Sequence, residues 1–138
     1  MKAYFLRTDS IEGKAVSYQG YLGEIENTLE AKQKYVGGII QCVSLSPEID
    51  LILNDEGKLM GLPLNRFWVM DGEVVDIIVG NVLCCRHDDK GNFLDILEED
   101  IPFILDSLKV LIKYGDRIIS VPEKLLMTYE EREENKWI

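Results

Sequence analysis

The stretch of sequence that decides the fold runs from Asp50 to Asn81 and reads DLILNDEGKLMGLPLNRFWVMDGEVVDIIVGN. Its first apolar run predicts a strand, and Asn54 to Gly57 predicts a hairpin turn, because Gly57 suits a positive φ. The chain would return through Lys58-Leu59-Met60. A polar pair, Asn65-Arg66, then stands between apolar runs. Polar groups among apolar residues need a structural or a functional reason.

Apolar and β-branched runs on either side predict further strands. We expect them at residues 2–8, 39–45, 49–53 and 74–86, with residues 15–22 either a short strand or a loop. Gly80 inside the longest run indicates a bulge or a close backbone approach. The segment His87 to Asn92 predicts a second hairpin, with Phe93 to Leu97 as its return strand.

Three helices are expected from periodicity and capping residues. The first carries Ile25, Leu29 and Val36 on one face and ends at Gly37. The clearest begins at Asp100 and ends before Gly115. The last is an acidic C-terminal helix over about residues 121–136, capped by Ser120.

The order of these elements predicts the α+β class, with a mainly antiparallel sheet and two to three helices packed on one face of it. The length of 138 residues is that of one domain, so we expect a single domain over residues 1–138.

The formal net charge is −10, from 25 acidic and 15 basic residues. This charge disfavours direct binding to nucleic acid and favours a partner with a basic surface, although solubility alone also explains it. No apolar run approaches the ~20 residues that span a bilayer, and the N-terminus has no signal-peptide pattern. We therefore expect a cytoplasmic protein without membrane contact.

The chain has three cysteines, Cys42, Cys84 and Cys85, and all of them lie in apolar runs. The odd number and these positions predict buried free thiols and not disulfides. His87 is the only histidine. Cys84 and Cys85 are adjacent, so on a strand they point to opposite faces and cannot both bind one ion. We expect no metal and no cofactor.

Catalytic patterns are missing from the sequence. It contains no GxxxxGK[ST] or GxGxxG phosphate loop, and no nucleophile, base and orienting group stand out. We therefore expect that the protein is not an enzyme.

Two groups of polar residues remain as candidate sites. The first is a pocket formed by Asn65, Arg66 and Asn81, whose amides and guanidinium could bind a small molecule or a nucleotide signal. Alternatively, the three side chains satisfy backbone groups or a nearby acid.

The second candidate is an acidic face that could imitate the phosphates of a DNA strand. Its residues come from two clusters: Asp88, Asp89, Asp95, Glu98 and Glu99, and then Glu130, Glu131, Glu133 and Glu134. Alternatively, these acids form a solvated surface, and those next to Asp100 favour the positive end of a helix dipole.

The central segment also resembles a known family. The N-D-E-G-K turn at residues 54–58, the L-P-L-N-R run at 62–66 and the V-G-N strand at 79–81 are similar to a domain-of-unknown-function family of bacterial phages and conjugative elements. The resemblance covers about residues 39–106, and the family's recurring polar positions match Asn65, Arg66 and Asn81.

That resemblance implies a small protein made in a bacterial host by a mobile element. By analogy, such proteins inhibit host defence, as anti-CRISPR or anti-restriction proteins do, and the partner would be a host nucleic-acid-binding protein such as a nuclease. The alternative is a small-molecule or nucleotide-signal binding protein.

Overall fold

The computed structural model describes residues 1–130. Its larger sheet has six strands in the order β4-β1-β9-β6-β5, with β10 paired to β9, and every pairing in it is antiparallel. The strands are β1 (Lys2–Leu6), β4 (Tyr21–Glu24), β5 (Ile40–Ser44), β6 (Ile49–Asn54), β9 (Val82–His87) and β10 (Phe93–Leu94).

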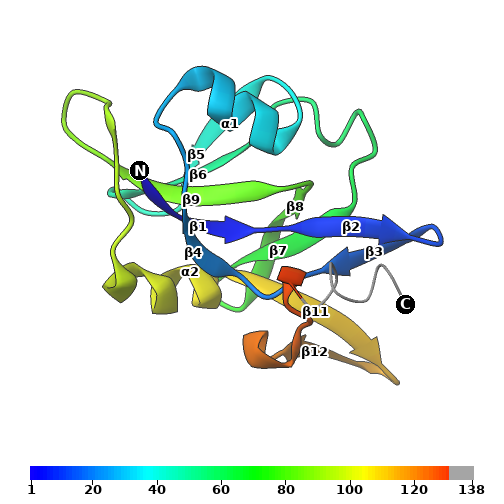
Figure 1. Cartoon of the computed structure of the whole chain (residues 1–138). Helices are drawn as coiled ribbons and strands as arrows, with labels where there is room; N and C mark the ends of the chain where they lie inside the picture. Colours follow the sequence, from blue (N-terminus) through cyan, green and yellow to red (C-terminus); the bar gives the residue numbers. More distant parts are fainter. Residues whose placement is uncertain (131–138) are drawn as a thin grey trace.

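A second, four-stranded antiparallel sheet has the order β12-β11-β7-β8, and β2 and β3 form a separate two-stranded ribbon. Figure 1 shows the β11–β12 hairpin extending away from the larger sheet. The strands are β2 (Thr8–Ile11), β3 (Lys14–Ser17), β7 (Leu64–Met70), β8 (Glu73–Val79), β11 (Leu108–Tyr114) and β12 (Arg117–Val121).

Two short α-helices cover the larger sheet, α1 (Leu29–Val36) and α2 (Ile101–Ser107). The hydroxyl of Thr28 caps α1 by accepting from the Ala31 amide, and the helix ends as expected at Gly37, which has φ of 81°. Single 3-10 turns, η1 (Glu98–Asp100) and η2 (Glu123–Leu125), complete the described elements. The predicted α+β class with a mainly antiparallel sheet is confirmed.

The core consists of two clusters, one on each face of the larger sheet. Val36 of α1 packs with Phe5 and Leu83, whereas Ile104 of α2 packs with Leu6 and Leu51. The two helices therefore lie on opposite faces of the sheet, as Figure 1 also shows, and not on one face. Alternation along a strand explains the arrangement, since neighbouring residues of β1 and β9 face opposite clusters.

The clearest predicted helix is only half right. The chain is helical from Ile101 to Ser107, but Leu108–Tyr114 forms β11, which pairs with β7 and β12. The sequence LKVLIKY satisfies both the helical period and the alternating pattern of a strand. Pairing with two strands on both sides decides between them.

The predicted C-terminal helix is wrong over its first part. Ser120 lies in β12 instead of capping a helix, Glu123–Leu125 makes one 3-10 turn, and helical backbone begins at Tyr129. The remainder of that prediction, residues 131–136, lies outside the described residues.

The central segment also differs from its predicted form. Gly57 has no positive φ, and the chain runs from β6 through a turn into β7, so Asn54 to Gly57 is not a hairpin. The hairpin instead joins β7 to β8 through Asp71 and Gly72, whose φ angles of 51° and 77° are those of a type I′ turn.

The long predicted strand over residues 74–86 is divided into β8 and β9 at Gly80, which has φ of 75°. The positive φ favours glycine, and a Cβ at this position would also come within 2.8 Å of a Leu62 methyl group, which would have to shift. The hairpin of β9 and β10 is confirmed, since Phe93 pairs with His87 and Leu94 with Arg86, but its return strand ends at Leu94 instead of Leu97.

Candidate functional site

Asn65 lies in strand β7 and not in a loop, and its side chain is buried. Its amide nitrogen donates to the carbonyl oxygens of Leu6 at 2.9 Å and Gly80 at 2.7 Å. The side chain therefore joins the end of β1 to the break between β8 and β9. The Asn65 side chain thus supplies hydrogen bonds to two carbonyl oxygens at the ends of strands, where buried backbone groups need partners.

Arg66 is fully buried beside it, at 0% exposure. Its Nη1 donates to the Asn65 carbonyl and side-chain oxygens, and its Nη2 donates to the Tyr18 carbonyl at 2.7 Å and to Glu123 Oε1 at 2.8 Å. Glu123 Oε1 also accepts from the Gly20 amide. Arg66 thus clamps η2 onto the segment between β3 and β4. Its Nε has no hydrogen-bond partner among the described residues.

Asn81 follows the break at Gly80, where its side-chain oxygen accepts from the Thr8 amide at 3.0 Å. Asn65, Arg66 and Asn81 therefore lie in one region, around the junction of β1, β7 and β9. Their side chains bond to backbone groups and to Glu123, and they are absent from the linings of the two pockets described below. Ligand binding by these residues stays a prediction.

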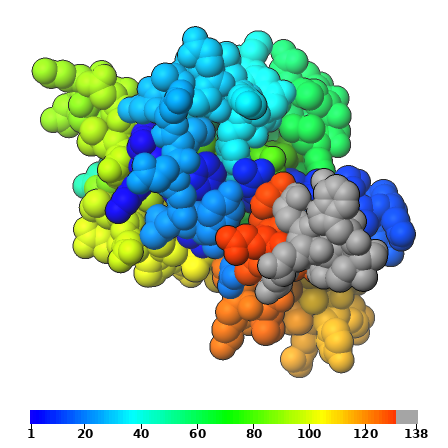
Figure 2. All heavy atoms as spheres, in the orientation of Figure 1, coloured from blue at the N-terminus to red at the C-terminus, as the bar shows by residue number. Residues whose placement is uncertain are grey.

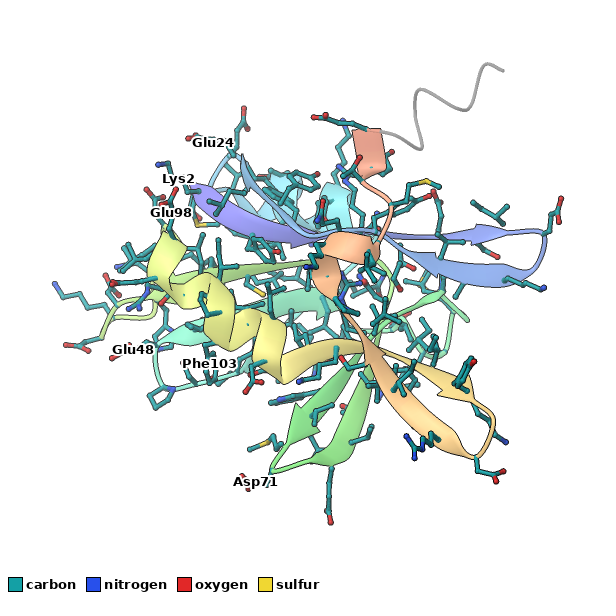
Figure 3. All side chains as sticks on the ribbon, turned by 90° about the horizontal axis from the view of Figure 1, so that it is seen from below. Lys2, Glu24, Glu48, Asp71, Glu98 and Phe103 are labelled. Atoms are coloured by element: carbon teal, nitrogen blue, oxygen red, sulfur yellow. The ribbon has the colours of Figure 1, made fainter. Side chains whose placement is uncertain are left out.

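Three of the chain's exposed carboxylates meet at one end of the larger sheet. Glu24, Asp95 and Glu98 line a pocket of about 360 Å³ together with Lys2. Figure 3 shows Lys2, Glu24 and Glu98 gathered there, with Glu48 at the same end. Two of these carboxylates, Asp95 and Glu98, belong to the predicted acidic face.

Arg86 of β9 organises the neighbouring acids. Its guanidinium donates from Nε and Nη2 to the buried carboxylate of Asp100 and lies 3.4 Å from exposed Glu48. These hydrogen bonds from Arg86 hold the pKa of Asp100 below its usual range, and those to Asp100 raise the pKa of Arg86. The pair ties η1, which carries exposed Glu98 and Glu99, to the larger sheet.

Exposed and partly exposed acids surround this pocket and the Arg86–Asp100 pair, and we call this set of acids the acidic end. Asp88 lies in the loop between β9 and β10. Its Oδ1 accepts from the Lys90 and Asn92 amides, and its Oδ2 accepts from the Asn92 side chain, which lowers the pKa of Asp88. Asp88 therefore shapes its loop while it keeps its charge. The members of the acidic end are Glu24, Glu48, Asp88, Asp89, Asp95, Glu98 and Glu99.

The second predicted acidic cluster is only partly described. Glu130 is exposed and lines a different pocket, of about 400 Å³, together with Arg7, Tyr21 and Tyr129. That pocket and the pocket of the acidic end share Leu22, so both lie along β4. Glu131, Glu133 and Glu134 lie outside the described residues.

Sequence reasoning missed several contributors to these two places. Glu24 and Glu48 stand in no acidic run, and Arg7 is the single charged residue at the end of an apolar strand. Each reaches its neighbours through sheet pairing or packing between distant segments. No local pattern marks such residues, and the isolated charge of Arg7 after an apolar run is the only signal.

The three thiols differ in exposure. Cys84 and Cys85 are buried in the two opposite core clusters, as their adjacency predicts, whereas Cys42 is exposed, contrary to expectation. Burial raises the pKa of Cys85 to about 12 and that of Cys84 further still. His87 Nδ1 lies 2.9 Å from Asp50 Oδ2. Within residues 1–130, no three His, Cys, Asp or Glu side chains form a group that could hold a metal.

This difference predicts a simple labelling result. In the native protein at pH 8, a thiol-reactive disulfide reagent should modify one cysteine per chain, because only Cys42 reaches solvent. A Cys42→Ser variant should then show no rapid reaction, and denaturant should expose the remaining two thiols. Rapid modification of two or three native thiols would contradict the described core.

None of the helices in the described part of the chain is long and apolar enough to cross a membrane.

Residues 12–109 match the family of domains of unknown function designated DUF3846, so the chain belongs to that family. The match begins well before residue 39 and therefore includes most of the N-terminal part that the resemblance to phage and conjugative-element domains left outside. No curated protein and no solved structure matches the chain.

Proposed function

We propose that the protein is a mobile-element inhibitor of host defence, of the anti-CRISPR or anti-restriction type. In this proposal it is not an enzyme, and its acidic end binds the basic groove of a host nucleic-acid-binding protein such as a nuclease. The observation that carries the proposal is the gathering of exposed carboxylates from separate segments at one end of the larger sheet.

The charge of this end is poorly compensated. Glu24, Asp95 and Glu98 share their pocket with a single cation, Lys2, and Arg86 is engaged by the buried carboxylate of Asp100. A groove that binds nucleic acid carries lysines and arginines to neutralise phosphates. The same groove attracts a fixed array of carboxylates, and the complementary potentials accelerate the encounter.

Rigid placement supports mimicry over simple solubility. The acids of this end stand on β4, on η1 and on the segments next to β6, β9 and β10, and their backbone is held by sheet pairing and by the Arg86–Asp100 pair. A preorganised array loses less entropy on binding than mobile side chains on a flexible tail. The acidic end therefore serves better as a docking surface than a disordered acidic segment would.

The test is a reversal of charge at the acidic end. We expect the wild-type chain, immobilised and exposed to bacterial lysate, to capture nucleic-acid-binding proteins identified by mass spectrometry. The double variant Glu24→Lys/Glu98→Lys should lose this capture, with affinity for the purified partner reduced at least about tenfold, because reversal replaces attraction by repulsion. Binding should also weaken steeply with added salt.

A matched control distinguishes the acidic end from the total charge. The variant Glu56→Lys/Glu73→Lys changes net charge equally at two exposed positions outside the acidic end, and it should bind the partner as the wild type does. The wild type should also release bound DNA from the captured protein. Binding that survives high salt, or equal losses in both double variants, would sink the proposal.

A further inference from the structure

The pocket around Arg7 is separate from the acidic end and has a different chemistry. It encloses about 400 Å³ between the end of β1, the start of β4 and the segment that follows η2. Figure 2 shows the described residues just before position 130, in red, against the blue N-terminal segment. The Gln19 amide donates to the Met127 carbonyl and closes one side. Its volume suits a small ligand.

Arg7 is held rigidly in this pocket. Its Nε donates to the Tyr21 hydroxyl at 2.8 Å, and its guanidinium carbon lies 4.4 Å from the ring centre of Tyr129 and 5.1 Å from that of Tyr35. These stacking contacts orient the guanidinium plane. The edge that carries the two Nη groups, with four N–H donors, remains for other partners.

Arg7 differs from the other enclosed arginines of the described chain. Arg66 pairs with Glu123, and Arg86 pairs with Asp100, but no carboxylate among residues 1–130 forms an ion pair with Arg7. Even Glu130, which lines the same pocket, forms none. The chain has ten more acids than bases, yet none of the acids that the structure describes pairs with this half-buried arginine, so its Nη edge is available to an anion from outside.

We propose that this pocket binds a small oxyanion joined to a planar ring, the chemistry of a nucleoside monophosphate. The Nη edge of Arg7 forms a fork for the oxyanion. Tyr21, stacked on Phe5 at 5.3 Å, and Leu22 offer apolar surface for the ring. This site is independent of the proposed inhibitory function and of the residues Asn65 and Asn81.

The experiment titrates the full chain with adenosine 5′-monophosphate, adenosine and inorganic phosphate in a calorimeter. We expect the monophosphate to bind at least about tenfold more tightly than either part alone, because both subsites contribute. Amide shifts in a nitrogen–proton spectrum should concentrate at Gln19, Gly20 and Leu22.

Two variants test the role of Arg7. Arg7→Lys keeps the charge but removes the fork, and Tyr21→Phe removes only the hydroxyl that orients Nε. Each should weaken the monophosphate at least about fivefold. The matched control Arg117→Lys, on exposed β12, should bind as the wild type does.

If Arg7→Lys lowers the melting temperature, its weaker binding could come from lost stability, and the affinity of Tyr21→Phe for the monophosphate then tests the proposal. The proposal would be overturned if phosphate alone bound as tightly as the monophosphate, or if no heat were released at millimolar monophosphate. It would also be overturned by amide shifts confined to the acidic end, or by equal affinities of Tyr21→Phe and Arg117→Lys for the monophosphate.

Discussion

Replacement of Arg66 by alanine should destabilise the protein by about 3–5 kcal/mol, the cost of removing one partner from a buried ion pair. The variant removes the hydrogen bonds that Arg66 donates to the Tyr18 carbonyl and to the Asn65 side-chain oxygen, and it opens a cavity at a fully buried position. Thermal unfolding followed by circular dichroism should show a midpoint lower by about 10–15 °C.

The matched control is Arg117→Ala, which removes the same side chain from an exposed edge strand and should change the free energy of unfolding by less than about 0.5 kcal/mol. The comparison also decides between the two interpretations of Asn65, Arg66 and Asn81. A structural clamp predicts loss of stability, whereas a ligand pocket predicts an Arg66→Ala variant that melts like the wild type and has lost its ligand.

The buried Arg66 shows why the candidate site was only partly predictable. The sequence singled out Arg66 because it interrupts apolar runs, but the acceptors of its Nη2, in Tyr18 and Glu123, are 48 and 57 residues away. Local spacing carries no information about such pairs. In contrast, Asp95, Glu98 and Glu99 are close in sequence, so their shared surface was predictable.

A similar division applies to the fold. Strands β5 and β6 and the β9–β10 hairpin follow from β-branched runs and turn residues that act locally. Strand β11 was predicted as helix because Leu108 and Lys109 have their deciding partners, Trp68 and Phe67, about forty residues earlier. The glycine at position 80 indicated an irregularity in the strand, but the sequence did not show that Gly80 packs closely against Leu62 and separates β8 from β9.

Replacement of Asp100 by alanine is the second change with a large expected effect, about 3 kcal/mol of lost stability. The Asp100 carboxylate accepts from Arg86 and from the Leu97 amide, and its side chain is 6% exposed. Arg86 is 23% exposed, so water recovers part of the cost when its partner is removed. Urea unfolding at pH 7 measures the loss.

The dependence on pH isolates this carboxylate. Its pKa is lower in the folded protein than in the unfolded chain, so its contribution is complete above about pH 5 and disappears as the pH falls through the folded value. The stability difference between the wild type and Asp100→Asn should therefore be constant from pH 7 to pH 5 and shrink below pH 4. A difference that grows on acidification would contradict the assigned pair.

The pair also connects stability to the proposed function, because Asp100 is buried and cannot touch a partner, whereas Glu98 and Glu99 on the same turn are exposed. If the pair only positions the acidic end, an Arg86→Met/Asp100→Leu variant should recover stability, since apolar residues often replace a buried ion pair without loss. Partner binding should then return with the fold. Recovered stability without recovered binding would instead assign Arg86 or Asp100 a direct electrostatic part in recognition.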